Sequence, residues 1–82
     1  MSSKKKITGI YPGTFDPFTF GHLDIVTRAT HIVEKLIISV AENQNKTPIF
    51  SLRERISMIN ETLTELVKKD CEILVVGFDD LF

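Results

Sequence analysis

Short apolar runs alternate with longer amphipathic stretches along the chain, a pattern that predicts strands and helices in turn. Residues 7–11, ITGIY, are β-branched and aromatic and stop at the turn signal Pro12-Gly13, so they predict a first strand. Residues 36–41, LIISVA, are almost continuously apolar, which is typical of a parallel strand covered on both faces. Residues 73–76, ILVV, predict a third strand that Gly77 closes.

Two amphipathic stretches lie between these strands. In the first, apolar side chains recur at spacings of three and four and predict a helix with one buried stripe, for which Thr19 is a suitable N-cap. This stripe contains Leu23, Val26, Ala29 and Val33.

The second stretch opens with Ser51 and Glu54, an S-x-x-E capping box in which each side chain satisfies a free backbone donor of the other residue. Lys68 and Lys69 stand at the carboxyl end, where the helix dipole favours cations. The apolar stripe of this predicted helix consists of Leu52, Ile56, Ile59, Leu63 and Leu66.

The predicted order is therefore strand, helix, strand, helix, strand. Because crossovers between parallel strands are right-handed, this order predicts an α/β fold with a Rossmann-like parallel sheet, and residues 1–82 as part of one domain. Three strands and two helices leave sheet edges and apolar surface uncovered, and residues 79–82, DDLF, look like the start of another element. We therefore expect the front half of a larger fold.

Composition narrows the class of protein. Of the 82 residues, 43% are hydrophobic and 26% charged, as in a soluble globular domain, and a net charge of -1 does not favour a nucleic-acid partner. No run approaches the ~18 apolar residues of a membrane span, and no apolar signal segment opens the chain. We expect a cytoplasmic protein without a membrane partner, in which the single cysteine, Cys71, is a packing residue.

The loop between the first strand and the first helix carries the candidate chemistry. It reads YPGTFDPFTFGH over residues 11–22, and in open α/β sheets this loop is a preferred ligand site because helix amides point into it. Gly13 would let the backbone turn, and Gly21 would let a ligand approach the first helical turn. Thr14 and His22 could then hold a phosphate from two sides, although neither the G-x-G-x-x-G nor the P-loop fingerprint is present.

The same loop resembles the signature loop of the phosphopantetheine adenylyltransferase family, and TFGH at residues 19–22 is similar to the [H/T]-x-G-H motif of the nucleotidyltransferase superfamily. Two features differ from the family. Phe20 stands where the family commonly has Asn, and the R-G-x-R and I-S-S segments of the family's second half are absent. Further similarity lies in residues 24–29, Lys46 with Pro48, residues 50–55 and residues 75–78.

This resemblance implies that the adenylyl group of ATP is transferred to 4'-phosphopantetheine with Mg²⁺, which gives dephospho-coenzyme A and pyrophosphate. It assigns His22 to the α-phosphate, and Thr14 with the Phe15 backbone amide to the space between the two phosphates. It assigns Lys46 to the phosphate of pantetheine and Phe82 to the pantetheine arm. We expect no protein metal ligand, and Asp16 is better interpreted as a structural side chain that bonds the local backbone.

Two alternatives remain open. Cytidylyl- and nicotinamide-mononucleotide adenylyltransferases share the motif but usually have His at the position of Thr19; a second possibility is a non-catalytic fragment that binds phosphopantetheine or a nucleotide. We expect the chain alone to be catalytically poor, His31 to be exposed, and Arg53, Glu54 and Arg55 to form an ion-pair cluster or a subunit contact. The resemblance also implies a homo-oligomer, which is a hexamer in the family.

Overall fold

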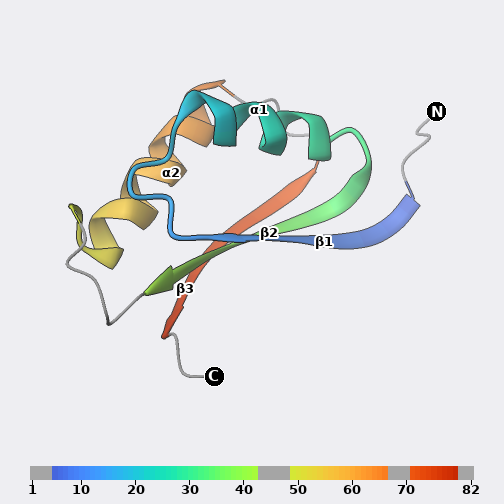
Figure 1. Cartoon of the computed structure of the whole chain (residues 1–82). Coiled ribbons are helices and arrows are strands. Elements are labelled where there is room, and N and C mark those ends of the chain that lie inside the picture. The colour runs from blue at the N-terminus through green and yellow to red at the C-terminus, as the bar shows by residue number, and fades with distance from the viewer. Residues whose placement is uncertain (1–4, 43–48, 67–70, 80–82) are drawn as a thin grey trace.

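The computed structural model describes residues 5–42, 49–66 and 71–79. Its elements follow the predicted order of strands and helices, which confirms the α/β class (Figure 1). In chain order they are β1 (Lys5–Gly13), α1 (Phe20–Ala29), β2 (Val33–Glu42), α2 (Leu52–Leu66) and β3 (Glu72–Asp79).

The three strands form one parallel sheet in the order β1-β2-β3. Both helices lie on the same side of this sheet (Figure 1), because two right-handed crossovers in the same direction put their helices on one face. The core fills the space between helices and sheet, and its fully buried side chains include Val26 of α1, Ile38 of β2 and Ile59 of α2. The fold is thus a partial Rossmann-like unit with one helical layer.

The opposite face of the sheet carries a row of apolar side chains. The register aligns Ile10 with Ile37 and Ile37 with Leu74, and side chains of neighbouring residues alternate between faces. Ile10 is 67% exposed and Leu74 38% exposed. The expectation that β2 is covered on both faces is therefore met on one face only by the elements that the structure describes.

The first helix is shorter than its apolar spacing predicted. It ends at Ala29, and Val33 is the first residue of β2 and not part of the helical stripe. Thr30 forms the C-cap, with its backbone N–H bonded to carbonyls of the last turn and its hydroxyl donating to the Thr27 carbonyl oxygen at 2.7 Å. The four-residue step from Ala29 to Val33 matched the helical period only because a short turn carries the chain back to the same core.

Two predicted strand ends were also wrong. β1 continues through Pro12 and Gly13, which pair with Ser39 and Val40; Pro12 is tolerated there because β2 is the only described neighbour of β1. Gly77 lies inside β3 and does not close it. A Cβ atom at Gly77 would lie 2.9 Å from Ile56 Cδ1, so glycine lets α2 pack directly on this strand.

Three further local predictions agree with the structure, whereas Lys68 and Lys69, predicted at the carboxyl end of the second helix, lie outside the described residues. Ser51 and Glu54 form the reciprocal capping box, with the Ser51 N–H donating to Glu54 Oε1 at 2.9 Å and the Glu54 N–H donating to Ser51 Oγ at 3.1 Å. Cys71 is a core residue with 6% exposure, and His31 is exposed.

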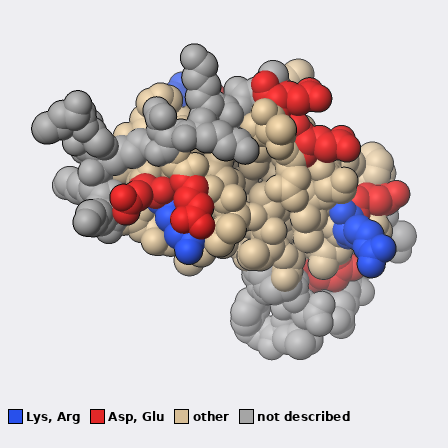
Figure 2. Space-filling view, turned by 180° about the vertical axis from the view of Figure 1, so that it is seen from behind, with Lys and Arg blue, Asp and Glu red and all other residues tan. Residues whose placement is uncertain are grey.

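The molecular surface carries charges of both signs. On the face shown in Figure 2, acidic and basic side chains are interspersed around the margin, and uncharged atoms lie between them. Among the described residues, no helix is long and apolar enough to cross a membrane.

Candidate functional site

The loop that connects β1 to α1 is anchored by a buried phenylalanine. Phe15 is 2% exposed and has a φ of 50°, in the left-handed region that costs a side chain roughly 1–2 kcal/mol. Its ring covers Gly13, where an added Cβ would lie 2.8 Å from Phe15 Cζ. Gly13 has a negative φ, so glycine is required here to make room for this ring and not, as its place in the loop suggested, to turn the backbone.

Four aromatic side chains, Tyr11, Phe15, Phe18 and His22, form a cluster over the end of β1. The His22 imidazole meets the Phe15 ring edge-on at 4.9 Å and stacks on Phe18 at 5.5 Å between ring centroids. Tyr11 contacts Phe15 at 5.2 Å, and its partial burial raises the pKa of its hydroxyl above the ordinary value of 10.0. The cluster holds the His22 ring on two sides, which restricts it to one orientation.

Thr19 and His22 cap the start of α1 together, which confirms Thr19 as the N-cap. The His22 backbone N–H donates to Thr19 Oγ1 at 3.4 Å, and the Thr19 backbone N–H donates to His22 Nδ1 at 2.9 Å. Because Nδ1 accepts a hydrogen bond, the neutral ring carries its proton on Nε2. His22 therefore keeps an Nε2–H donor at the positive end of the helix dipole.

Thr14 follows β1 and is exposed. Its carbonyl oxygen accepts a hydrogen bond of 2.8 Å from Nη1 of Arg55, which comes from the first turn of α2. The peptide between Thr14 and Phe15 is trans, since Asp16-Pro17 is the only cis bond in the described chain. The Phe15 N–H therefore lies in the same peptide plane but points in the opposite direction, away from Arg55.

Arg55 connects three segments of the fold. It is 2% exposed, and besides Thr14 its guanidinium bonds the Ala41 carbonyl oxygen at 3.1 Å and Glu42 Oε1 at 2.8 Å. Its Nε donates to the carbonyl oxygens of Phe50 at 3.0 Å and Ser51 at 3.3 Å. Arg55 is thus buried and pairs with Glu42, so the predicted ion-pair cluster with Arg53 and Glu54, or a subunit contact, is wrong for Arg55. Its neighbour Arg53 is exposed.

Asp16 makes a second connection between the loop and the start of α2. Its Oδ2 accepts from the Ile49 N–H at 2.8 Å and its Oδ1 accepts from the Phe50 N–H at 3.0 Å. The structural interpretation of Asp16 agrees with this, but the bonded backbone is distant in sequence and not local. Among the described residues no group of three or more His, Cys, Asp or Glu side chains could hold a metal ion.

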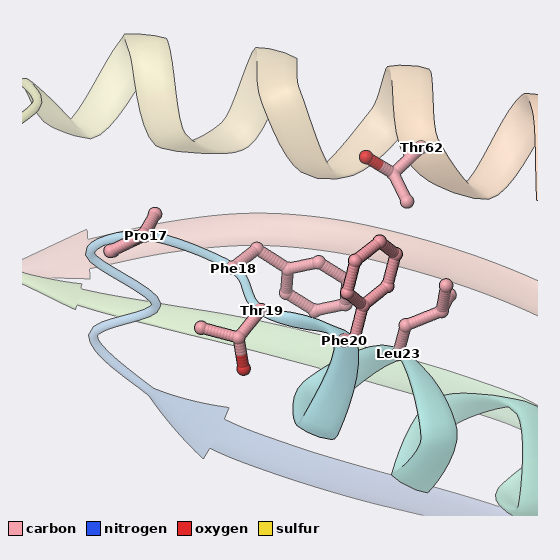
Figure 3. Close-up of a pocket in the computed structure, with 6 residues that line it drawn as sticks. All are labelled: Pro17, Phe18, Thr19, Phe20, Leu23 and Thr62. Atoms are coloured by element: carbon pink, nitrogen blue, oxygen red, sulfur yellow. The ribbon is translucent and has the colours of Figure 1, made fainter.

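An apolar groove of about 450 Å³ lies beside the loop. Figure 3 shows the Phe18 and Phe20 side chains at the start of α1, with Thr62 of α2 across from them. Phe20 is 84% exposed. Phe20, which stands between Thr19 and Gly21 in the motif, therefore lines the groove between the two helices.

Two predicted site residues, Lys46 and Phe82, lie outside the described residues. Of the others, the structure brings Phe15 and His22 into direct ring contact and leaves Thr14 exposed at the start of the same loop. The sequence analysis missed the role of Arg55. Its spacing held a signal, since Arg55 falls three residues after Leu52 and four before Ile59, on the apolar stripe of α2.

In a parallel α/β unit, the loop at the carboxyl end of β1 and the N-terminus of the helix that follows form the place where open α/β folds commonly hold a ligand. The sequence profile of the cytidylyltransferase-like family matches residues 10–81, and the chain belongs to this family.

Individual relatives give a more specific similarity than the family as a whole. The chain is 47% identical over 81 residues to a phosphopantetheine adenylyltransferase of Rhodospirillum centenum, a match that covers 99% of this chain and 44% of the relative. It is 50% identical over 76 residues to that of Buchnera aphidicola subsp. Acyrthosiphon pisum, which covers 90% of this chain and 43% of the relative. The resemblance predicted from the loop is thereby confirmed, and the chain spans less than half the length of these relatives.

Proposed function

We propose that this chain supplies the phosphate-binding loop of a pantetheine-phosphate adenylyltransferase, which transfers the adenylyl group of ATP to 4'-phosphopantetheine. The observation that carries this proposal is the Thr19–His22 pair. It keeps the His22 Nε2–H as a donor at a helix N-terminus, in a loop that resembles the family's signature. The names of the relatives support the acceptor.

In the proposed reaction, an oxygen of the pantetheine phosphate attacks the α-phosphorus of ATP, and the bond from that phosphorus to the pyrophosphate oxygen breaks. A phosphate monoester is already largely dianionic at pH 7, so no base has to remove a proton. The protein aligns the two phosphates and neutralises the charge that builds on the oxygens of the α-phosphate. We assign this neutralisation to the His22 Nε2–H and the Phe15 N–H, contacts with the phosphates to the Thr14 hydroxyl, and binding of the pantetheine phosphate to Lys46.

The proposal includes Mg²⁺ as an ion carried by the phosphates of ATP. Both carboxylate oxygens of Asp16 already accept backbone hydrogen bonds, and the described residues offer no ligand cluster. No step is assigned to the ion. Phe82 as a contact of the pantetheine arm, a homo-oligomeric assembly and a cytoplasmic location complete the proposal.

The test is pyrophosphate release by protein made from its own gene, with ATP and either 4'-phosphopantetheine or nicotinamide mononucleotide. We expect release with phosphopantetheine, and a loss of about 100-fold or more in kcat in His22→Ala with a smaller change in KM. His31→Ala is the matched control, since His31 is exposed beyond the other end of α1, and it should leave kcat unchanged. Release that depends on nicotinamide mononucleotide would identify another acceptor, and an unchanged kcat in His22→Ala would contradict the role of His22.

A further inference from the structure

The Phe15 amide, to which the proposed reaction assigns charge neutralisation, belongs to a peptide whose other end is held by a buried cation. The Thr14 carbonyl oxygen and the Phe15 N–H are parts of one trans peptide group and therefore point in opposite directions. The oxygen accepts from Arg55 Nη1 at 2.8 Å. Any rotation that moved the N–H would break this bond.

We propose that Arg55 is a positioning residue that aims the Phe15 N–H at the phosphates of ATP. This inference rests on the proposed function, because it concerns the same loop. Arg55 itself does not touch substrate; its guanidinium binds the opposite side of the peptide. A bond from a cation to the carbonyl also polarises the peptide, which makes its N–H a better donor.

The guanidinium can act in this way because it cannot move. Four further acceptors hold it: the carbonyl oxygens of Ala41, Phe50 and Ser51, and the Glu42 carboxylate. It is 2% exposed, so rotation would leave a buried charge without its partners. Arg55 thus fixes the Thr14–Phe15 peptide relative to the end of β2 and the start of α2.

Only arginine fits this arrangement. Its planar fork presents five donor hydrogens in fixed directions. Here its three nitrogens reach five acceptors on three segments, with the single Nε hydrogen shared between the carbonyl oxygens of Phe50 and Ser51. A lysine has a compact ammonium group with three donors and cannot span them. Arg55→Lys therefore keeps the charge and removes the geometry.

The experiment compares Arg55→Lys with Arg53→Lys, its exposed neighbour on α2, in protein made from its own gene. We expect Arg55→Lys to lower kcat for pyrophosphate release about tenfold or more, with KM for phosphopantetheine changed by less than about threefold. Arg53→Lys should change neither. Equal kcat values in folded Arg55→Lys and wild type would overturn the proposal.

A second variant tests the same role in case Arg55→Lys does not fold, a defect that circular dichroism would detect. Glu42→Gln keeps an oxygen for Arg55 Nη2 and removes the charge that holds the guanidinium. We expect its kcat to fall severalfold in the same direction, and an unchanged kcat in this variant would count against the proposal.

A measurement without turnover separates this inference from the proposed function. Inorganic pyrophosphate is titrated into ¹⁵N-labelled protein while the Phe15 amide signal is followed. Wild-type protein should show a saturable shift of this signal, and Arg55→Lys a smaller or absent one. If wild type releases no pyrophosphate but shows this difference, the proposed function fails and the positioning role stands; identical shifts in both proteins, or no shift in wild type, would overturn the positioning role.

Discussion

The backbone N–H of Thr19 donates a 2.9 Å hydrogen bond to Nδ1 of His22, and the His22 backbone N–H donates back to Thr19 Oγ1. A capping box usually has Glu or Gln at the third helical position. Here a histidine takes that position, so one ring nitrogen stabilises the helix start and the other is left for a ligand. The fold thereby selects the tautomer of the residue that we assign to the α-phosphate.

This relationship predicts the protonation pattern of the ring. In neutral His22 the proton should reside on Nε2, because Nδ1 is an acceptor. Two-bond ¹H–¹⁵N correlation spectra of the imidazole distinguish the two tautomers directly. The exposed His31, whose Nδ1 lies 3.0 Å from the Thr27 carbonyl oxygen, serves as an internal comparison. A proton on Nδ1 of neutral His22 would contradict the capping geometry.

The sequence was sufficient for the features that depend on local chemistry. The capping roles of Thr19 and Ser51 were predictable because each uses a side chain three residues from its partner. The parallel α/β class followed from apolar runs that alternate with amphipathic stretches. The sheet topology also indicates the loop after β1 as the place for a ligand, and this assignment stays a prediction.

The features that were missed depend on contacts between segments far apart in sequence. Arg55 bonds Thr14, and Asp16 bonds Ile49 and Phe50, and no periodicity encodes such partners. The predicted end of the first helix was wrong for a related reason. Val33 belongs to β2, but its side chain lies in the same core as the apolar side chains of α1. The spacing of apolar residues indicates which side chains are buried but not which element carries them. Here the spacing continues from α1 into β2.

Substitution of Gly13, at the end of β1, and of Gly21, in the first turn of α1, should have different effects on stability. Gly13→Ala should lower the free energy of unfolding by about 1–3 kcal/mol, because its Cβ would lie 2.8 Å from the buried Phe15 ring. Gly21→Ala should leave the free energy of unfolding unchanged or raise it by up to about 1 kcal/mol. Gly21 lies in the first turn of α1, and the atom nearest to an added Cβ is Thr19 Oγ1 at 3.6 Å. Urea denaturation measures both.

Enzyme activity provides a second test of Gly21→Ala. The added methyl group of Gly21→Ala stands at the helix N-terminus where we expect a phosphate, so kcat/KM for ATP should fall although the protein is as stable as wild type. Full activity in Gly21→Ala would show that no ligand approaches the first turn of α1 closely.

Tyr11 predicts a loss of stability at alkaline pH. Burial raises the pKa of its hydroxyl above 10.0, so the folded state holds this proton more tightly than the unfolded state does. The contribution is fully present below about pH 10 and is lost as the pH rises through the pKa of the folded state. The urea midpoint of wild type should therefore fall more steeply above pH 10 than that of Tyr11→Phe, which has no proton to lose; parallel curves would contradict the prediction.

Asp16 offers a direct choice between a structural and a metal-binding carboxylate. Asp16→Asn retains one acceptor oxygen but places an amide NH₂ against a backbone N–H of Ile49 or Phe50, which now lacks its partner. We expect the free energy of unfolding to fall by about 1–3 kcal/mol, equally with and without Mg²⁺. Asp24→Asn is the matched control, because Asp24 pairs with Arg28 on the exposed face of α1, and its stability should match wild type. A Mg²⁺-dependent stabilisation of wild type that Asp16→Asn abolishes would instead make Asp16 a metal ligand, and the connection between the loop and α2 would then depend on Arg55 alone.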